Sequence, residues 1–314
     1  HALADLVGPP LHPSPPARPV AAPAAEAGAA SVRPADRAEG GLEATVFGGT
    51  GFLGRHVAAA LAAQGAHVWC PTRAELAAGH HAMRPLGHVV YAIGLTGDFR
   101  SRPVDTVEVN ARLLGALLHE TRWTSFLALS STRVYGADPA TGPWREDMAL
   151  NVRPTADALY DLSKLTGEAL VLGHPAATAR VARLSNVFGP GMSEATFLGA
   201  ILAAARRGEP VVVGEDARSA KDYIAVEHAA AALAAIALGG RERIYNVAGG
   251  ERIAHADVAA MLAGEGVRIR FAEGGQRRTL PAIDIARLAA DFPAPQDSRR
   301  ALQAFVSATI GARR

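Results

Sequence analysis

The stretch that decides the fold is LEATVFGGTGFLGRHVAAALAAQGAHVWC, residues 42–70. In it, a short apolar run over 45–47 leads into closely spaced glycines, and a helical pattern follows over 52–64 and stops at Gly65. A second apolar run occupies 66–70. A strand, a turn, a helix and another strand within about 30 residues are typical of a βαβ unit, which belongs to a parallel sheet.

The chain beyond this stretch repeats the alternation of strands and helices. Buried strands are expected over 88–95, 125–131 and 178–189, and helices over 105–120 and 159–173. This order predicts an α/β protein with a Rossmann-type, doubly wound parallel sheet. After Gly189 the pattern loosens into a helix over 194–209, a strand over 210–214, a helix within 224–240 and, from Glu251, short helices and turns.

Composition narrows the class of protein. The 314 residues are 49% hydrophobic, which is enough for a large core. A net charge of +2, 5% aromatic residues and the lack of a long basic run do not suggest a nucleic-acid partner. The single cysteine, Cys70, excludes an internal disulfide framework and a Cys-rich zinc site, and it fits a reducing compartment.

Targeting signals and metal-ligand patterns are also missing from the sequence. No apolar run approaches the roughly 20 residues of a membrane span, and residues 1–30 lack a secretory signal. We therefore expect a cytoplasmic protein without a membrane partner. The histidines at 80, 81, 88 and 174 show no ligand spacing, so no metal site is expected.

The glycine-rich turn predicts a dinucleotide site. In GGTGFLG, the glycines Gly48, Gly51 and Gly54 follow a strand and open a helix. Glycines allow a tight turn and let backbone N–H groups approach a phosphate, and the helix N-terminus adds positive potential there. This spacing, in a strand–turn–helix context, predicts binding of the pyrophosphate of NAD(P).

The end of the second strand bears on the choice of cofactor. An acidic residue at this point would bind the ribose hydroxyls of NAD. Here the chain has Thr72 and Arg73, and a hydroxyl with a guanidinium suits the 2′-phosphate of NADP better. The sequence thus favours NADP over NAD, with Glu75 as the competing acidic residue.

A tyrosine, a lysine and a serine supply the candidate chemistry. Tyr160 and Lys164 are four apart in a predicted helix and share one face. A nearby ammonium is expected to lower the pKa of the Tyr160 phenol. The phenol could then exchange a proton with a substrate oxygen while a hydride moves to or from nicotinamide. Ser131, at the exit of a predicted strand, would orient that oxygen.

Seven segments carry a family resemblance. They are GGTGFLG, VEVNARLLGALL, SSTRVYG, YDLSK, RLSNVFGPG, KDYIAVEH and YNVAGG, in this order. With them, the chain from about Thr45 to Ser298 resembles the extended short-chain dehydrogenase/reductase family. The resemblance is to its NAD-dependent epimerase/dehydratase branch, which acts on nucleotide sugars.

The resemblance implies roles for individual residues. Ser131, Tyr160 and Lys164 resemble the catalytic triad. The residues that resemble the cofactor-binding set are Gly48, Thr50, Gly51, Phe52, Leu53, Gly54, Arg73, Asn110 and Ser185, where Asn110 would brace the site. The residues that resemble the substrate-binding set are Asn186, Lys221, Arg277 and Arg278, where Lys221 replaces the usual arginine that holds a diphosphate. The family often dimerises, so a homodimer is a further expectation.

The chain departs from the family pattern in two places. Between Arg73 and the strand at 88–95 there is room for only a fragment of the usual strand and helix, so we expect the adenine side of the site to be partly open. The 4,6-dehydratases of this branch carry an acidic pair directly after the serine, where this chain has Thr132 and Arg133. Without those carboxylates, elimination of water lacks its acid–base pair, and dehydration is disfavoured.

These observations lead to a domain division and a function. We predict a Pro/Ala-rich flexible arm or linker over 1–41, an NAD(P)-binding domain over 42–189 and a smaller, mainly substrate-binding lobe over 190–314, with segments that return to the main sheet. The predicted function is an NAD(P)-dependent epimerase or ketosugar reductase acting on a nucleotide-linked sugar. The alternatives are an NADP-dependent reductase of a non-sugar ketone and a non-catalytic, nucleotide-sensing protein. Pro143 and Trp144 could contact substrate or anchor a loop.

Overall fold

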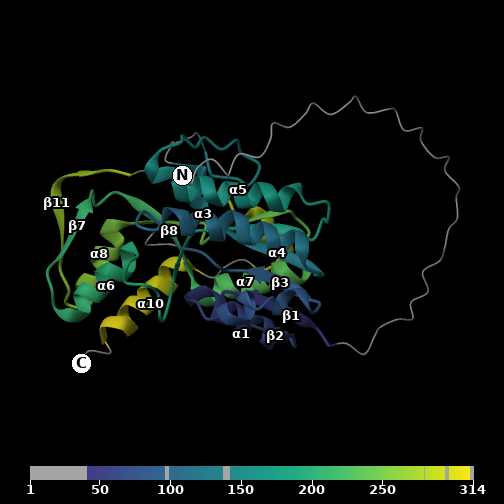
Figure 1. The fold of residues 1–314 in the computed structure, drawn as a ribbon. Helices are drawn as coiled ribbons and strands as arrows, with labels where there is room; N and C mark the ends of the chain where they lie inside the picture. Colours follow the sequence, from purple (N-terminus) through teal and green to yellow (C-terminus); the bar gives the residue numbers. More distant parts are fainter. Residues whose placement is uncertain (1–40, 96–98, 137–141, 279, 294–296, 312–314) are drawn as a thin grey trace, which may run out of the picture. The chain divides into compact units, whose positions relative to one another are not determined.

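The main sheet runs through the compact unit of residues 40–314. The structure, a computed structural model, describes residues 41–95, 99–136, 142–278, 280–293 and 297–311 (Figure 1). The predicted arm over 1–41 therefore lies outside the described residues, apart from Gly41. Within the described part, six parallel strands pair in the order β2-β1-β3-β4-β5-β9. Their bounds are β1 (Glu43–Phe47), β2 (His67–Trp69), β3 (His88–Tyr91), β4 (Ser125–Ser131), β5 (Ala179–Leu184) and β9 (Ile244–Val247).

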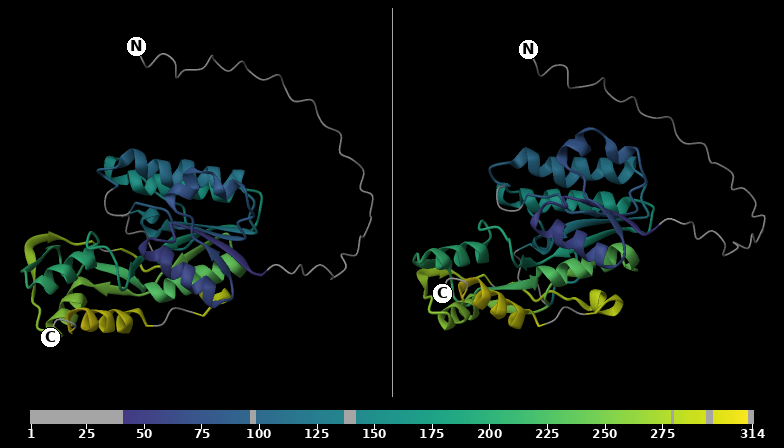
Figure 2. Two further views of the ribbon diagram at one scale, coloured as in Figure 1. Left: turned by 60° about the horizontal axis from the view of Figure 1, so that its bottom comes forward. Right: turned by 90° about the horizontal axis from the view of Figure 1, so that it is seen from below.

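Helices cover both faces of this sheet, which confirms the predicted doubly wound fold. One face is covered by α1 (Phe52–Ala63) and α7 (Val226–Gly239), the other by α4 (Leu114–Glu120) and α5 (Leu159–Gly173) (Figure 2). Strand side chains alternate between the two layers. Val46 packs in the cluster with α1 and α7, whereas Phe47 packs in the cluster with α4 and α5.

The predicted single strand over 178–189 is wrong, because the chain changes sheets at Ser185. β5 ends at Leu184, and β6 (Asn186–Phe188) pairs with β8 (Ala220–Ala225) in a second sheet that also contains β10 (Arg252–Ala254). Another parallel pair joins β7 (Val211–Glu215) to β11 (Ile269–Gln276). The helices α6 (Phe197–Arg207), α8 (His255–Gly264) and α10 (Ser298–Gly311) pack with these strands around a separate apolar cluster. The carboxyl end of β5 is thus the point where the chain passes from the main sheet into the smaller lobe.

The end of the chain is more regular than expected. Short helices and turns were predicted from Glu251, yet β11 has eight residues and α10 has fourteen. Gly274 and Gly275 lie inside β11, and glycine weakens the strand pattern in a sequence. The buried stripe of α10 consists of Leu302, Val306 and Ile310, which are four residues apart.

The connection from β2 to β3 is as short as predicted. It contains only α2 (Arg73–Ala77) and the 3-10 turn η2 (His80–Ala82), so β2 forms the edge of the main sheet. The next connection contains α3 (Pro103–Val107), a π-helical turn η3 (Glu108–Leu113) and α4. The remaining short helices are η4 (Thr132–Tyr135), η5 (Ala156–Ala158) and α9 (Ala286–Asp291). None of the helices in the described residues has the length and apolar character needed to cross a membrane.

Candidate functional site

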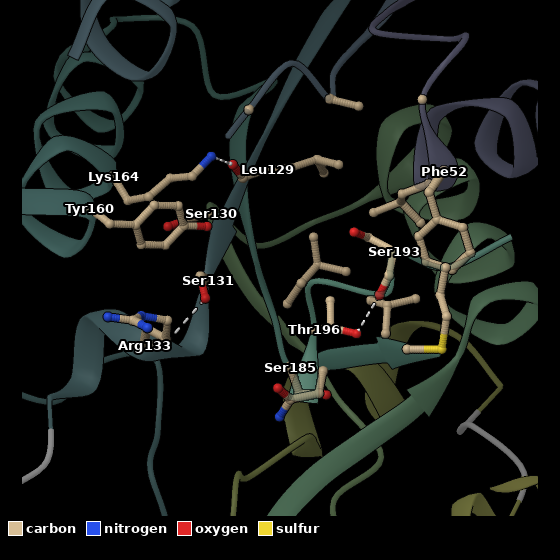
Figure 3. A pocket seen from close by; sticks show the side chains of 18 of the residues that line it. Phe52, Leu129, Ser130, Ser131, Arg133, Tyr160, Lys164, Ser185, Ser193 and Thr196 are labelled. Carbon is tan, nitrogen blue, oxygen red and sulfur yellow. Dashed lines mark hydrogen bonds between the residues drawn. The ribbon is translucent and has the colours of Figure 1, made fainter. Parts of the chain in front are cut away.

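A cavity of about 510 Å³ lies at the carboxyl ends of the main-sheet strands. Its walls come from the start of α1, the ends of β3, β4 and β5, the start of α5, the start of α6 and β8 (Figure 3). In doubly wound sheets, ligands bind at this edge, because loops from neighbouring strands diverge there. The cavity is therefore where the sequence-predicted site residues should be located.

The glycine turn fits the pyrophosphate of a dinucleotide. Gly48 has a φ of +84°, and a Cβ on it would meet the Ala92 backbone at 2.9 Å. A Cβ on Gly54 would meet the Gly48 carbonyl oxygen at 2.1 Å, so the turn requires both glycines. No described side chain caps α1, which leaves its first-turn N–H groups available to an anion. Gly51, Phe52, Leu53 and Gly54 line the cavity, whereas Gly48 and Thr50 are not among its lining residues.

The structure brings Ser131, Tyr160 and Lys164 together in the cavity wall (Figure 3). Ser131 ends β4, and the other two residues lie on the first turns of α5. Lys164 Nζ donates a hydrogen bond to the Leu129 carbonyl oxygen at 2.9 Å and lies 5.9 Å from the centre of the Tyr160 ring. The geometry therefore presents a phenol, a hydroxyl and an amine to one space.

The expected lowering of the Tyr160 pKa by Lys164 is wrong. Burial raises the pKa of the Tyr160 phenol to about 12, and the leading opposing influence is the charge of Arg133. Burial also lowers the pKa of Lys164 to about 8, because the ammonium is removed from water. Desolvation, a tertiary property, thus outweighs the local charge that the four-residue spacing suggested. At neutral pH Tyr160 is a protonated phenol, which can donate a proton.

Asn110 occupies the π-helical turn beside the lysine. Its Nδ2 donates to Ser163 Oγ at 3.0 Å, and among the described residues its buried Oδ1 has no hydrogen-bond partner. A Cβ placed on Gly94 would lie 3.5 Å from Lys164 Nζ and 3.9 Å from Asn110 Oδ1, so all three face one spot. Asn110 supports the site from behind, since it does not line the cavity.

The substrate-side predictions divide into two groups. Ser185, Asn186 and Lys221 line the cavity, and Lys221 Nζ lies 4.8 Å from the centre of the Phe197 ring. Asn186 Nδ2 donates to the Asp222 carbonyl oxygen at 2.8 Å.

Arg277 and Arg278 are absent from the described lining of this cavity. Arg278 Nε instead lies 3.7 Å from the Glu215 carboxylate. The predicted extra phosphate contact is therefore not brought into the cavity.

Of the two residues predicted to bind the 2′-phosphate, Thr72 already has a hydrogen-bond partner, and Arg73 has none among the described residues. Thr72 caps α2: its hydroxyl accepts from the Glu75 N–H at 3.2 Å and donates to the Glu75 carboxylate at 2.8 Å. This hydroxyl stabilises the helix start, and its contact with a 2′-phosphate stays a prediction. Arg73 is exposed, makes no hydrogen bond or ion pair with the described residues, and lies outside the cavity lining.

Sequence reasoning missed Arg133 and a buried polar network behind the site. Arg133 lines the cavity and pairs with Asp161. In the network, Glu168 of α5 accepts hydrogen bonds from Ser130 and Arg183, both of which are buried in strands. The available signal was a pair of arginines, Arg180 and Arg183, within a strand predicted to be buried.

The two remaining sequence features are Trp144 and the possible metal ligands. Trp144 is 3% exposed and stacks on Tyr135 with ring centres 5.2 Å apart, so it anchors its loop rather than lining the cavity. As for metals, the part of the chain that the structure describes contains no group of three or more His, Cys, Asp or Glu that could hold an ion.

The chain is similar to a family of known proteins over most of the described unit. The model of the NAD dependent epimerase/dehydratase family matches residues 44–248. A relative described as dTDP-4-dehydro-6-deoxy-D-allose reductase, from Streptomyces bikiniensis, is 26% identical over 310 residues, 84% of this chain and 94% of that protein. UDP-glucuronic acid decarboxylase 2 from Arabidopsis thaliana is 30% identical over 215 residues, 58% of this chain and 48% of that protein.

Coverage differs among these relatives. The chain spans about half the length, or less, of several curated relatives that it matches. Among solved structures, a UDP-N-acetylglucosamine 4-epimerase from Methanobrevibacter ruminantium M1 has a TM-score of 0.74 at 19% identity and covers 86% of this chain and 98% of its own. At that identity the likeness shows the fold.

Proposed function

The chain belongs to the NAD-dependent epimerase/dehydratase family, and we propose that it is an NAD(P)H-dependent reductase of a keto group on a nucleotide-linked sugar. The observation that carries this proposal is the buried Tyr160 phenol in the cavity wall, next to Ser131 and with Lys164 one turn later on the same helix. Reduction of a ketone needs a proton donor at the carbonyl oxygen. The choice of a reductase over an epimerase rests on the Streptomyces bikiniensis relative, a reductase that this chain matches over 94% of its length.

Each residue of the site has a part in this reaction. Tyr160 Oη gives its proton to the carbonyl oxygen, and Ser131 hydrogen-bonds the same oxygen and orients it. Lys164, held by the Leu129 carbonyl, and the Asn110 amide behind it fix the geometry at the start of α5. The α1 N-terminus holds the pyrophosphate of the cofactor. NAD(P)H, when bound, supplies the hydride.

The substrate class rests on the far wall of the cavity. Lys221 offers an ammonium to a diphosphate, which is a common use of lysine, and the neighbouring Phe197 ring offers an apolar face. The Streptomyces bikiniensis relative, of which the chain covers 94%, is named a reductase of a dTDP-linked keto sugar. Both observations support a nucleotide-linked ketosugar over a ketone without a nucleotide.

The first experiment measures turnover and bound cofactor on the same preparation. We expect the purified chain to oxidise NADPH when a dTDP-4-keto-6-deoxyhexose is added, and dTDP alone to raise its melting temperature. Mass spectrometry of the denatured protein should find little retained cofactor, because the adenine side is partly open. Retained NAD⁺ near one per chain, with interconversion of sugar epimers, would instead identify an epimerase. Binding of NADPH without a response to dTDP or UDP would favour a non-sugar ketone.

We further propose that Arg73 selects NADPH by binding its 2′-phosphate. An Arg73→Ala variant should raise the KM for NADPH about tenfold, since hydrogen bonds to charged groups contribute about 1.5–3 kcal/mol, and the exposed position places the effect at the lower end. The KM for NADH should change less than twofold. The matched control is Arg122→Ala. Arg122 is also exposed, but it lies just before the start of β4, whereas the cavity lies at the carboxyl ends of the strands. Equal changes of both KM values would contradict this role.

A further inference from the structure

Arg133 places a guanidinium against the ring of Tyr160. It lies two residues after Ser131, in η4, and lines the same cavity (Figure 3). Its Cζ is 5.4 Å from the centre of the Tyr160 ring and 5.6 Å from that of Phe99. At these distances a cation is attracted by an aromatic ring, and it is attracted more strongly by a ring that carries negative charge.

An ion pair holds this guanidinium in place. Arg133 Nε donates to Asp161 Oδ1 at 3.0 Å, and Nη2 donates to Asp161 Oδ2 at 3.3 Å. Asp161 is the next residue after Tyr160 on α5, and its side chain is 13% exposed. The carboxylate and the phenol belong to one helical turn, so the pair fixes the cation relative to the ring.

Lys164 is the second cation that faces the Tyr160 ring. Its Nζ is farther from the ring centre, at 5.9 Å, and donates to the Leu129 carbonyl oxygen. Burial lowers the pKa of Lys164 to about 8, so it loses charge in mildly alkaline solution. A guanidinium stays protonated over the whole range in which proteins are folded.

We propose that Arg133 is a positioning residue that stabilises the Tyr160 phenolate left when the phenol gives up its proton. Its catalytic consequence rests on the proposed function: the Tyr160 O–H bond breaks, the proton forms the O–H bond of the product alcohol, and solvent later returns a proton to the phenolate. The hydride comes from NAD(P)H. Among the charges that act on Tyr160, that of Arg133 is the leading one that lowers its pKa.

The other charged groups that act on Tyr160 or Arg133 include Asp161, Asp157 and Lys221. Asp161 raises the Tyr160 pKa, although its charge is shared with Arg133. Asp157 in η5 is paired with Arg100 at 2.8 Å. Lys221, on β8, lines the same cavity, and burial and, to a smaller extent, the charge of Arg133 lower the pKa of its ammonium. Of the cations near the Tyr160 ring centre, Arg133 at 5.4 Å is thus nearer than Lys164 at 5.9 Å.

The test measures ionisation of residue 160 directly, without turnover. A fluorinated tyrosine, whose electron-poor phenol ionises at lower pH, is incorporated at position 160 of the full chain, and its ¹⁹F shift is followed as the pH is raised. We expect Arg133→Met to raise the phenol pKa by about one pH unit, the low end for removal of an adjacent charge because the side chain is half exposed. Arg133→Lys should restore part of the shift.

Arg100 provides the matched control. Its Cζ lies 4.5 Å from the centre of the Phe99 ring, so Arg100→Met removes a neighbouring guanidinium that stacks on the adjacent ring. This variant should leave the phenol pKa within about 0.2 pH unit of the parent, because the Arg100 side chain is 61% exposed and paired with Asp157. A shift as large as that of Arg133→Met would show a general charge effect and overturn the assignment.

The role of Arg133 is also tested by the folding and the turnover of these variants. An unchanged phenol pKa in natively folded Arg133→Met, checked by circular dichroism, would overturn the inference, and a raised KM in that case would mean that Arg133 binds substrate. If Arg133→Met does not fold, the phenol pKa is compared between Arg133→Gln, which removes the charge, and Arg133→Lys, which keeps it. A shifted pKa in a protein that reduces no ketosugar would support the role of Arg133 while the proposed function fails.

Discussion

Replacement of Tyr160 by phenylalanine should lower kcat for ketone reduction by about 10³-fold, because proton donation by a positioned side chain contributes roughly 10² to 10⁴. The substitution removes one oxygen and keeps the ring, which is 7% exposed and packs 5.4 Å from the Phe99 ring. The KM for the cofactor should therefore change little. Steady-state rates at saturating substrate, with the melting temperature recorded alongside, measure both effects.

A second tyrosine serves as the matched control for this experiment. The Tyr245 hydroxyl accepts from the Arg241 and Glu242 N–H groups and donates to Asp291, and Tyr245 is outside the cavity lining. Tyr245→Phe removes the same atom from a part of the sheet without substrate contact, and kcat should remain within twofold of the parent. Retention of more than a tenth of kcat by Tyr160→Phe would show that another group is the proton donor.

Much of the cofactor side of the site can be predicted from the sequence, because the residues that form it are close together in the chain. The steric limits on Gly48 and Gly54 act within one turn, and the spacing of Tyr160 and Lys164 acts within one helix. The capping role of Thr72 could also have been predicted from the sequence, since Thr72 and Glu75 have the spacing of a capping box.

The rest depends on packing between distant segments. Arg133 meets Asp161 across 28 residues, and the raised pKa of Tyr160 comes from burial by several elements. The break between β5 and β6 has the same origin. The run over 178–189 resembles one strand in the sequence, but its two halves, before and after Ser185, pair in different sheets. No pattern within that run predicts which strands will lie beside it.

The buried pair of Arg183 and Glu168 should give the largest effect on stability. The two side chains are each 4% exposed, and Arg183 Nη2 donates to Glu168 Oε2 at 2.7 Å. Arg183→Met leaves the carboxylate buried without its cation, and breaking a buried pair in this way costs about 3–5 kcal/mol. Urea unfolding of the purified variant measures the loss.

The double variant separates the value of the pair from the cost of breaking it. Arg183→Met with Glu168→Leu removes both charges, so the free energy of unfolding should recover by more than half of the single-variant loss, since apolar groups of similar volume often replace a buried pair at little cost. The pair also has a positional effect, because Glu168 lies one turn after Lys164 on α5 and accepts from Ser130, the neighbour of Ser131. A single variant within 1 kcal/mol of the parent, or a double variant no more stable than the single one, would show that the network does not hold α5 against β4 and β5.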